Sequence, residues 1–109
     1  MAKYEKVISG DFDETLAVIT EGILASSSTA TLEEGSDFVI GDARCSIRVF
    51  ERYSYTGSNR VSMSLTLFQN ADSRICLSAI TSGGSQAMLF KINTLGEEAF
   101  LEKLKEIVE

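Results

Sequence analysis

The sequence predicts an α+β fold, an antiparallel meander sheet of about six or seven strands with two helices on one face. Between residues 37 and 92, apolar and polar residues alternate and short turn signals interrupt them, as in a sheet with one buried face. On either side of that stretch, apolar residues recur at helical spacing. A strongly twisted sheet that holds the C-terminal helix, like a reduced helix-grip fold, is the preferred architecture. A flat two-layer α/β sandwich is the alternative.

The first elements are predicted to be a strand, a helix and a second strand. Residues 3–9 are of mixed character and contain lysines, which is typical of an edge strand. Asp11 is the expected N-cap of the helix, and Glu14 completes a capping box. The serines at 26–28 end the helix, and residues 29–33 form the second strand. The buried stripe of the helix is Phe12, Leu16, Ile19 and Ile23.

The central hairpin is predicted from its turn. If residues 41–42 form a two-residue turn, Ile40 pairs with Ala43 and Phe38 with Cys45. All four side chains then share one face, because side chains alternate along a strand.

The strands 43–55 and 60–69 are each expected to point their odd-numbered apolar residues toward the helices. Because both sets are odd-numbered, their connection needs an odd number of residues, and a three-residue loop at 57–59 satisfies this. The expected inward residues are Cys45, Ile47 and Val49 on the first strand, and Val61, Met63, Leu65 and Leu67 on the second.

The C-terminal part is predicted as two further strands and a helix. A loop at 70–72 leads into a strand with Ile75, Leu77 and Ala79 inward, and a turn at Gly83-Gly84 leads into a strand with Met88, Phe90 and Ile92 inward. In the closing helix, Thr94 and Glu97 form a second capping box. Its apolar stripe is Phe100, Leu101, Leu104, Ile107 and Val108.

Composition narrows the class of protein. We expect one domain, residues 1–109. The net charge of −6 disfavours nucleic acid and anionic membranes as partners. No apolar run is long enough to span a bilayer and no secretory signal is visible, so a cytoplasmic location is expected. The absence of histidine and the presence of only two cysteines disfavour a structural zinc site, and no metal or cofactor is expected. Cys45 and Cys76 are expected on opposite faces, unpaired.

Glu51 is the acidic residue that fits the alternation least well. Strict alternation places it inward, beside the hydroxyls of Tyr53 and Tyr55, where it could act as an acid in a cavity. Alternatively, a β-bulge near Phe50, or the end of the strand, turns Glu51 to solvent, and this interpretation is favoured because bulges are common in long bent strands.

The opposite face of the sheet is expected to carry arginines and aromatic residues. Arg44, Arg48 and Arg52 fall at even spacing and could bind a phosphate or carboxylate, although an ordinary solvated face explains them more simply. Phe50 and Phe68 are expected to point outward beside them. Arginine with exposed aromatic residues is typical of interfaces, so this open face is a candidate surface for homodimerisation.

Five segments carry a resemblance to a known family. They are Gly41-Asp42-Ala43-Arg44-Cys45, Glu51-Arg52-Tyr53-Ser54-Tyr55, Gly57-Ser58-Asn59-Arg60-Val61, Ser82-Gly83-Gly84-Ser85-Gln86 and Phe90-Lys91-Ile92-Asn93-Thr94. Together they resemble a family of small uncharacterised Firmicutes proteins, catalogued as a domain of unknown function. The resemblance covers nearly the whole chain and implies a bacterial cytosolic protein, with no activity, cofactor or catalytic residue to carry over.

Three functions fit these residues. The first is a non-catalytic module that binds a small ligand or a protein, with homodimerisation through the open face. The second is a small carrier of an apolar molecule between the sheet and the C-terminal helix, which the bulky inward residues disfavour. The third is an enzyme that uses Glu51 and a tyrosine as acid and base, and no motif supports it.

Overall fold

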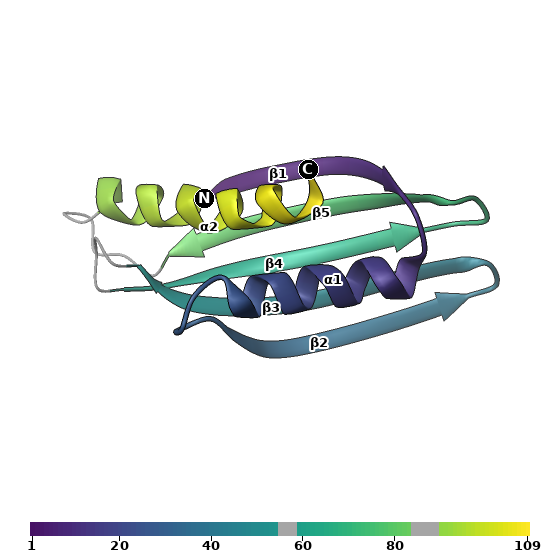
Figure 1. Cartoon of the computed structure of the whole chain (residues 1–109), viewed down its shortest axis with the longest axis horizontal. Helices are drawn as coiled ribbons and strands as arrows, with labels where there is room; N and C mark the ends of the chain where they lie inside the picture. The colour runs from purple at the N-terminus through teal and green to yellow at the C-terminus, as the bar shows by residue number, and fades with distance from the viewer. Residues whose placement is uncertain (55–58, 84–89) are drawn as a thin grey trace.

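The computed structural model is a sheet covered on one face by two helices (Figure 1). The structure describes residues 1–54, 59–83 and 90–109. Within these residues the elements are β1 (Ala2–Ser9), α1 (Phe12–Ala25), β2 (Thr31–Ile40), β3 (Ala43–Ser54), β4 (Asn59–Gln69), β5 (Arg74–Gly83) and α2 (Phe90–Val108). The strand order is β1-β5-β4-β3-β2, with every neighbouring pair antiparallel. The predicted α+β class and antiparallel meander are therefore confirmed.

The described part of the sheet has five strands rather than six or seven, for two reasons. The first is that the expected strand at 29–33 and the first arm of the central hairpin form one continuous strand, β2, with a bulge between Leu32 and Glu34. The second is that the end of the expected last strand, from Phe90, belongs to α2, which begins before the predicted cap at Thr94. The rest of that strand and Gly84 of its turn lie outside the described residues.

The central hairpin has the predicted register. Ile40 pairs with Ala43 and Phe38 with Cys45, and Gly41 has the positive φ of 57° that a tight turn requires. β4 and β5 also present the predicted side chains to the helices. Their fully buried apolar residues are Val61, Met63, Leu65, Leu67, Ile75 and Ala79, with Leu77 almost completely buried.

The predicted orientation of β3 is wrong. Its even-numbered residues face the helices, and Cys45, Ile47 and Val49 lie on the open face. The reason is the connection to β4: Ser54 pairs with Asn59, which leaves an even number of residues, 55–58, between them. Asn59 of the expected loop already belongs to β4, and the remainder of that loop lies outside the described residues.

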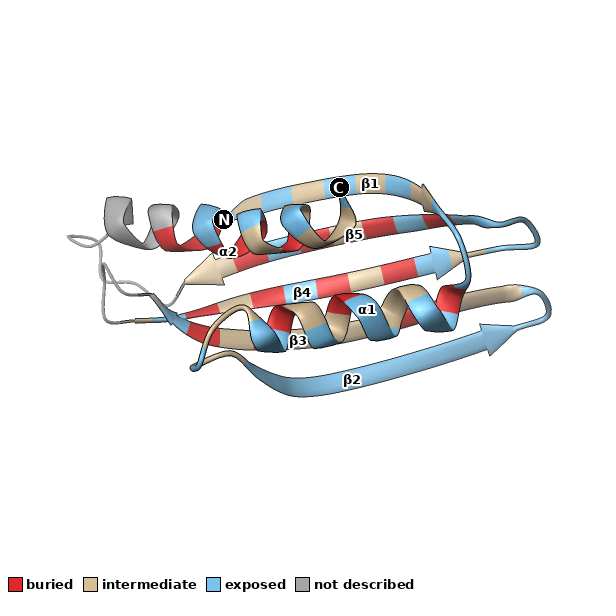
Figure 2. Ribbon diagram, viewed as in Figure 1, coloured by how far each residue is buried: buried red, intermediate tan, exposed pale blue. Residues whose placement is uncertain are grey.

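Two helices cover the other side of the sheet. Asp11 caps α1 as predicted, since its Oδ2 accepts a hydrogen bond from the Glu14 N–H at 2.9 Å. In Figure 1, α2 lies along β1 and β5, and α1 lies beside it over β3 and β4. Figure 2 shows buried residues on the inner strands, while β2 is exposed along its whole length. The core cluster includes Phe12, Ile19, Ile23, Phe50, Phe100 and Leu104.

Candidate functional site: the open sheet face

The open face is the side of the sheet away from the helices, and an apolar row crosses it. The row has one side chain from each strand in register: Val7 on β1, Cys76 on β5, Phe68 on β4, Cys45 on β3 and Phe38 on β2. Val7 and Phe38 are each 59% exposed and Phe68 is 42% exposed. The row therefore forms an apolar band from one edge of the sheet to the other.

Phe68 is the central feature of this face, because β4 is the middle strand of the five. Its ring lines three separate depressions. One of about 520 Å³ extends over β5 and β1 and includes Val7 and Cys76. One of about 100 Å³ extends toward β2 and includes Phe38 and Cys45. The third, of about 250 Å³, lies toward Arg74. Phe68 thus stands as a ridge with hollows on both sides.

Two ion pairs lie at the margins of this face. The Lys3 Nζ lies 3.9 Å from Glu5 Oε1 on β1. At the start of β5, a guanidinium nitrogen of Arg74 lies 2.9 Å from Oδ2 of Asp72, which precedes the strand. These pairs flank a centre of hydroxyl and apolar side chains. The uncharged residues on the inner strands include Ile47, Val49, Ser64, Thr66, Ser78 and Ile80.

Glu51 lies on the open face, away from the core, as the favoured interpretation expected, and not in the inward position that strict alternation gives. No bulge is responsible, because the pairing of β3 with β4 is continuous; the whole strand is oriented the other way. One carboxylate oxygen lies 2.6 Å from an Arg60 guanidinium nitrogen, and the other accepts a hydrogen bond from the Ser62 hydroxyl at 3.2 Å. The Arg60 guanidinium also lies over the exposed Tyr53 ring, 5.6 Å from its centre. Tyr55 lies outside the described residues.

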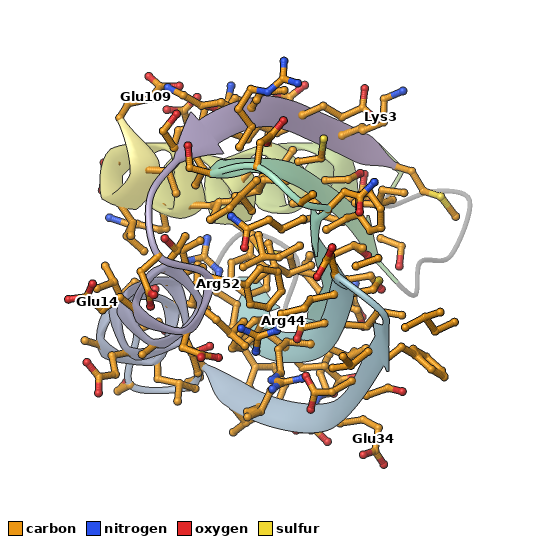
Figure 3. All side chains as sticks on the ribbon, turned by 90° about the vertical axis from the view of Figure 1, so that its right-hand side faces the viewer. Lys3, Glu14, Glu34, Arg44, Arg52 and Glu109 are labelled. Carbon is orange, nitrogen blue, oxygen red and sulfur yellow. The ribbon has the colours of Figure 1, made fainter. Side chains whose placement is uncertain are left out.

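The three arginines of β3 lie on the helix side, not on the open face where they were predicted. Figure 3 shows Arg44 and Arg52 between the sheet and the helices. Arg52 is only 8% exposed, and its guanidinium lies 4.7 Å from the centre of the Phe100 ring. The guanidinium of Arg44 lies 4.3 Å from the centre of the Phe12 ring. Arg48 lies between these two along β3.

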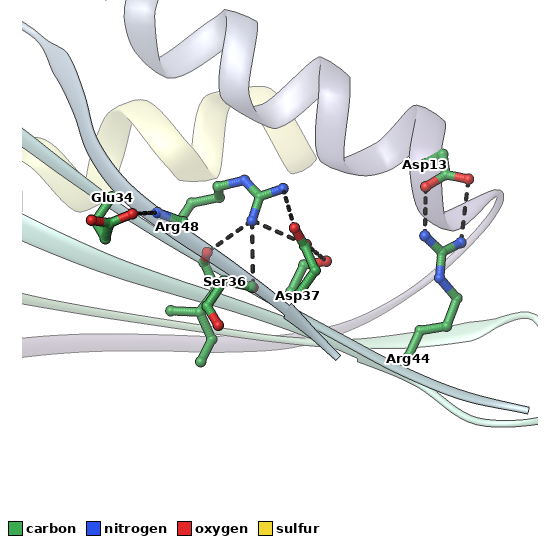
Figure 4. Close-up of polar contacts among 9 residues, drawn as sticks. Asp13, Glu34, Ser36, Asp37, Arg44 and Arg48 are labelled. Atoms are coloured by element: carbon green, nitrogen blue, oxygen red, sulfur yellow. Dashed lines mark hydrogen bonds and ion pairs between the residues drawn. The ribbon is translucent and has the colours of Figure 1, made fainter. Parts of the chain in front are cut away.

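Arg44 and Arg48 are each engaged by an aspartate. Figure 4 shows Arg44 bound by both oxygens of Asp13, at 2.6 and 3.3 Å. Arg48 lies 3.1 Å from Asp37 Oδ1. The hydrogen bonds from Arg44 lower the pKa of Asp13. The hydrogen bond from Ser46, and to a smaller extent that from Arg48, lowers the pKa of Asp37. Because the protein's own carboxylates occupy these two arginines, the geometry does not favour an anion site here.

Phe50 also differs from its predicted position. It is completely buried against the helices, whereas Phe68 points outward as predicted. The predicted pair of exposed phenylalanines is therefore replaced by Phe68 and Phe38. The signal for Phe38 was available in the sequence, because its pairing with Cys45 places both on one face. Whether Phe38 and Cys45 lie on the open or the helix-covered side could not be predicted from the sequence, because the connection from β3 to β4 determines it.

Cys45 and Cys76 are both free thiols and share the open face, contrary to the expectation of opposite faces. Phe68 on β4 separates them in the row. Two strand spacings of about 4.8 Å place their Cα atoms about 10 Å apart, beyond the roughly 7 Å that a disulfide bridges. The geometry thus explains the unpaired thiols by distance within one face.

The remaining observations concern membrane-spanning helices, metal ligands and the family of the chain. No helix in the described residues combines the length and apolar character needed to cross a membrane. The same residues contain no cluster of three or more Cys, Asp or Glu side chains placed to hold a metal ion. A family model, described as a family of unknown function (DUF6054), matches residues 1–109. No curated protein and no solved structure matches the chain.

Proposed function

Since the chain belongs to the DUF6054 family, whose function is unknown, we propose a function from the open sheet face: a non-catalytic protein-binding module that forms a homodimer. The apolar row from Val7 through Phe68 to Phe38 is the observation that carries this proposal. Contiguous exposed apolar patches of several hundred Å² on a soluble protein mark interaction surfaces. A second copy of the chain is the proposed partner.

The orientation of β3 strengthens this proposal. Its helix-facing side carries three arginines, while its outward side carries Cys45, Ile47 and Val49. The strand thus turns its more apolar side away from the helices. Burial of apolar surface stabilises a protein by about 25 cal/mol per Å², so covering this side is favourable. A partner that covers it would supply that burial.

The size of the face suits a dimer of ordinary dimensions. Five strands at about 4.8 Å spacing and about 10 residues at 3.3 Å give a face about 20 Å by 30 Å. That is about 600 Å² before the relief of side chains is counted. A standard interface buries about 800 Å² on each partner. The whole face, and not only the row, is therefore needed for a stable dimer.

The charge distribution favours a second copy over a strongly charged partner. Each copy carries a net charge of −6, so two copies repel at long range and a dimer depends on the contact surface itself. The middle of the open face is uncharged, which lets two identical faces meet without burying like charges. The flanking charges, which include the Lys3–Glu5 and Arg74–Asp72 pairs, then lie at a wet rim.

The test is Phe68→Asp. It places a carboxylate at the centre of the apolar row, where a dimer would bury it, and we expect a dimer to dissociate while each protomer stays folded. Val18→Asp is the matched control: it makes the same kind of change at an exposed apolar position on α1. Sedimentation velocity measures the oligomeric state, and circular dichroism checks folding. A wild-type chain that sediments as a monomer at high concentration would contradict the proposal. A Phe68→Asp variant that stays dimeric would place the interface elsewhere.

The other two functions considered from the sequence have less support. The space that an apolar cargo would occupy under α2 is filled by fully buried side chains, among them Met63, Leu65 and Leu104. An acid–base role for Glu51 requires a carboxylate available to a substrate, and Arg60 and Ser62 already contact both of its oxygens.

A further inference from the structure

We infer that the two-fold axis of the dimer runs parallel to the strands and passes over β4, so that β1 of one copy faces β2 of the other. This inference rests on the proposed function and specifies how the two faces meet. The axis of a face-to-face dimer lies between the sheets, and in aligned packing it runs close to the strand direction or close to the direction across the strands. The side chains of the open face distinguish these two directions.

Three rows in register cross the open face at right angles to the strands. The first is the apolar row already described. The second contains Glu5, Ser78, Thr66, Ile47 and Ser36, and the third contains Lys3, Ile80, Ser64, Val49 and Glu34. In each row the first residue lies on β1, the third on β4 and the last on β2. An axis along the strands places each row opposite the same row of the second copy, with the residues in reverse order.

This reversal matches apolar residues with apolar residues. In the apolar row, Val7 meets Phe38 of the second copy, Cys76 meets Cys45, and the two Phe68 rings meet on the axis. Offset stacking avoids a collision of these rings, and the hollows on the two sides of Phe68 leave room for it.

Aligned sheets cross at about 30°, so residues near β4 stay opposed. The inner members of the third row also match, because Ile80 of one copy then lies opposite Val49 of the other.

The same reversal matches opposite charges at the rim. Lys3 begins the third row on β1, and Glu34 ends it on β2. Figure 3 shows the two side chains at opposite edges of the sheet. An axis along the strands therefore brings Lys3 of each copy toward Glu34 of the other, twice in the dimer. Rim charges of opposite sign set the orientation in which two faces associate.

An axis across the strands gives a poorer match. If it follows the second row, Glu5 meets Glu5 of the second copy, and the apolar row lies against the row that ends in Lys3 and Glu34. If it follows the apolar row, the third row extends beyond the end of the second copy, because only one residue of β1, Ser9, follows Val7 on that face. Either arrangement opposes like charges or leaves Ile80 and Val49 uncovered.

A charge reversal tests the axis. Lys3→Glu and Glu34→Lys should each weaken the dimer about tenfold, because each change converts two attractive contacts into two repulsive ones. The double variant Lys3→Glu/Glu34→Lys should regain wild-type affinity. An equimolar mixture of the two single variants should form mixed dimers, which isotope labelling of one variant makes visible by native mass spectrometry.

Lys103→Glu and Glu21→Lys are the matched controls, because they make the same charge changes on α2 and α1, which lie on the other side of the sheet. They should leave the dissociation constant within about twofold of wild type. Single variants that dimerise like wild type, or a double variant that stays weak, would overturn the axis and leave the proposed function intact, since Phe68→Asp disrupts either arrangement. A monomeric wild-type chain would overturn both.

Discussion

Gly22 of α1 offers a test of the contact between the two helices. A Cβ atom added at this position would lie 2.6 Å from Ile107 Cδ1 and 2.9 Å from Ile107 Cγ1. Ordinary carbon–carbon contacts lie at about 3.5–4.0 Å, so a methyl group at this position fits only if the Ile107 side chain moves. This explains a glycine in the interior of a helix, where it is unfavourable by about 1 kcal/mol relative to alanine.

Gly22→Ala should therefore destabilise the protein although alanine is the better helix former. The gain in propensity is about 1 kcal/mol, and forcing a methyl group into a packed contact costs about 1–3 kcal/mol. We expect a net loss of up to about 2 kcal/mol in the free energy of unfolding. Ile107→Ala alone should cost about 2 kcal/mol, because its side chain is only partly buried.

The double variant Gly22→Ala/Ile107→Ala separates these effects. With the isoleucine truncated, the overlap disappears and the propensity gain remains, so the double variant should be more stable than Ile107→Ala. The coupling in this double-mutant cycle should be about 1–3 kcal/mol. Urea denaturation at one fixed protein concentration measures it. If Gly22→Ala is about 1 kcal/mol more stable than wild type while Ile107 is present, the Ile107 side chain moves aside without cost and the packing argument is wrong.

Two further predictions concern stability. Leu104→Ala should cost about 2–5 kcal/mol because the side chain is fully buried, whereas Glu102→Ala on the exposed side of α2 should change stability by less than about 0.5 kcal/mol; the reverse order in chemical denaturation would contradict the helix orientation. Asp37→Asn should make the free energy of unfolding depend less steeply on pH in the acid range. Ser46 and Arg48 lower the pKa of Asp37 below its unfolded value, so its contribution is present above pH 4 and is lost as the pH falls through the folded pKa. Wild type and variant should converge once the pH is below the folded pKa of Asp37, and parallel profiles would refute this.

Much of the sheet could be predicted because local signals agree with one another there. The two-residue turn at Gly41 sets the register of its hairpin, and the alternation along β4 has large apolar residues on one side and serines or threonines on most of the other. The N-cap at Asp11 was likewise readable from residue type and spacing. These features depend on neighbours in sequence, so one chain suffices to identify them.

The orientation of β3 could not be predicted, because it depends on the parity of a connection rather than on the strand itself. Both sides of β3 carry apolar groups, and the side with Ile47 and Val49 is the more apolar by composition. The orientation of β3 is nevertheless set by β4, because the large apolar residues of β4 must face the helices. Since an even number of residues separates the paired Ser54 and Asn59, the even-numbered residues of β3 share that face. Arg52 tolerates the resulting burial because its stem packs inward and its guanidinium stacks on Phe100.

This failed prediction bears on function. Sequence reasoning tends to fail where a protein departs from local consistency, and such departures concentrate at functional sites. Here the departure is that β3 buries arginines and exposes Cys45, Ile47 and Val49. The arginines on the helix side are each accommodated, by Asp13 or Asp37 or by an aromatic ring. The apolar residues on the open side have no comparable cover within the described residues. An open face that stays apolar while arginines are buried on the helix side supports the proposal that a second copy covers this face.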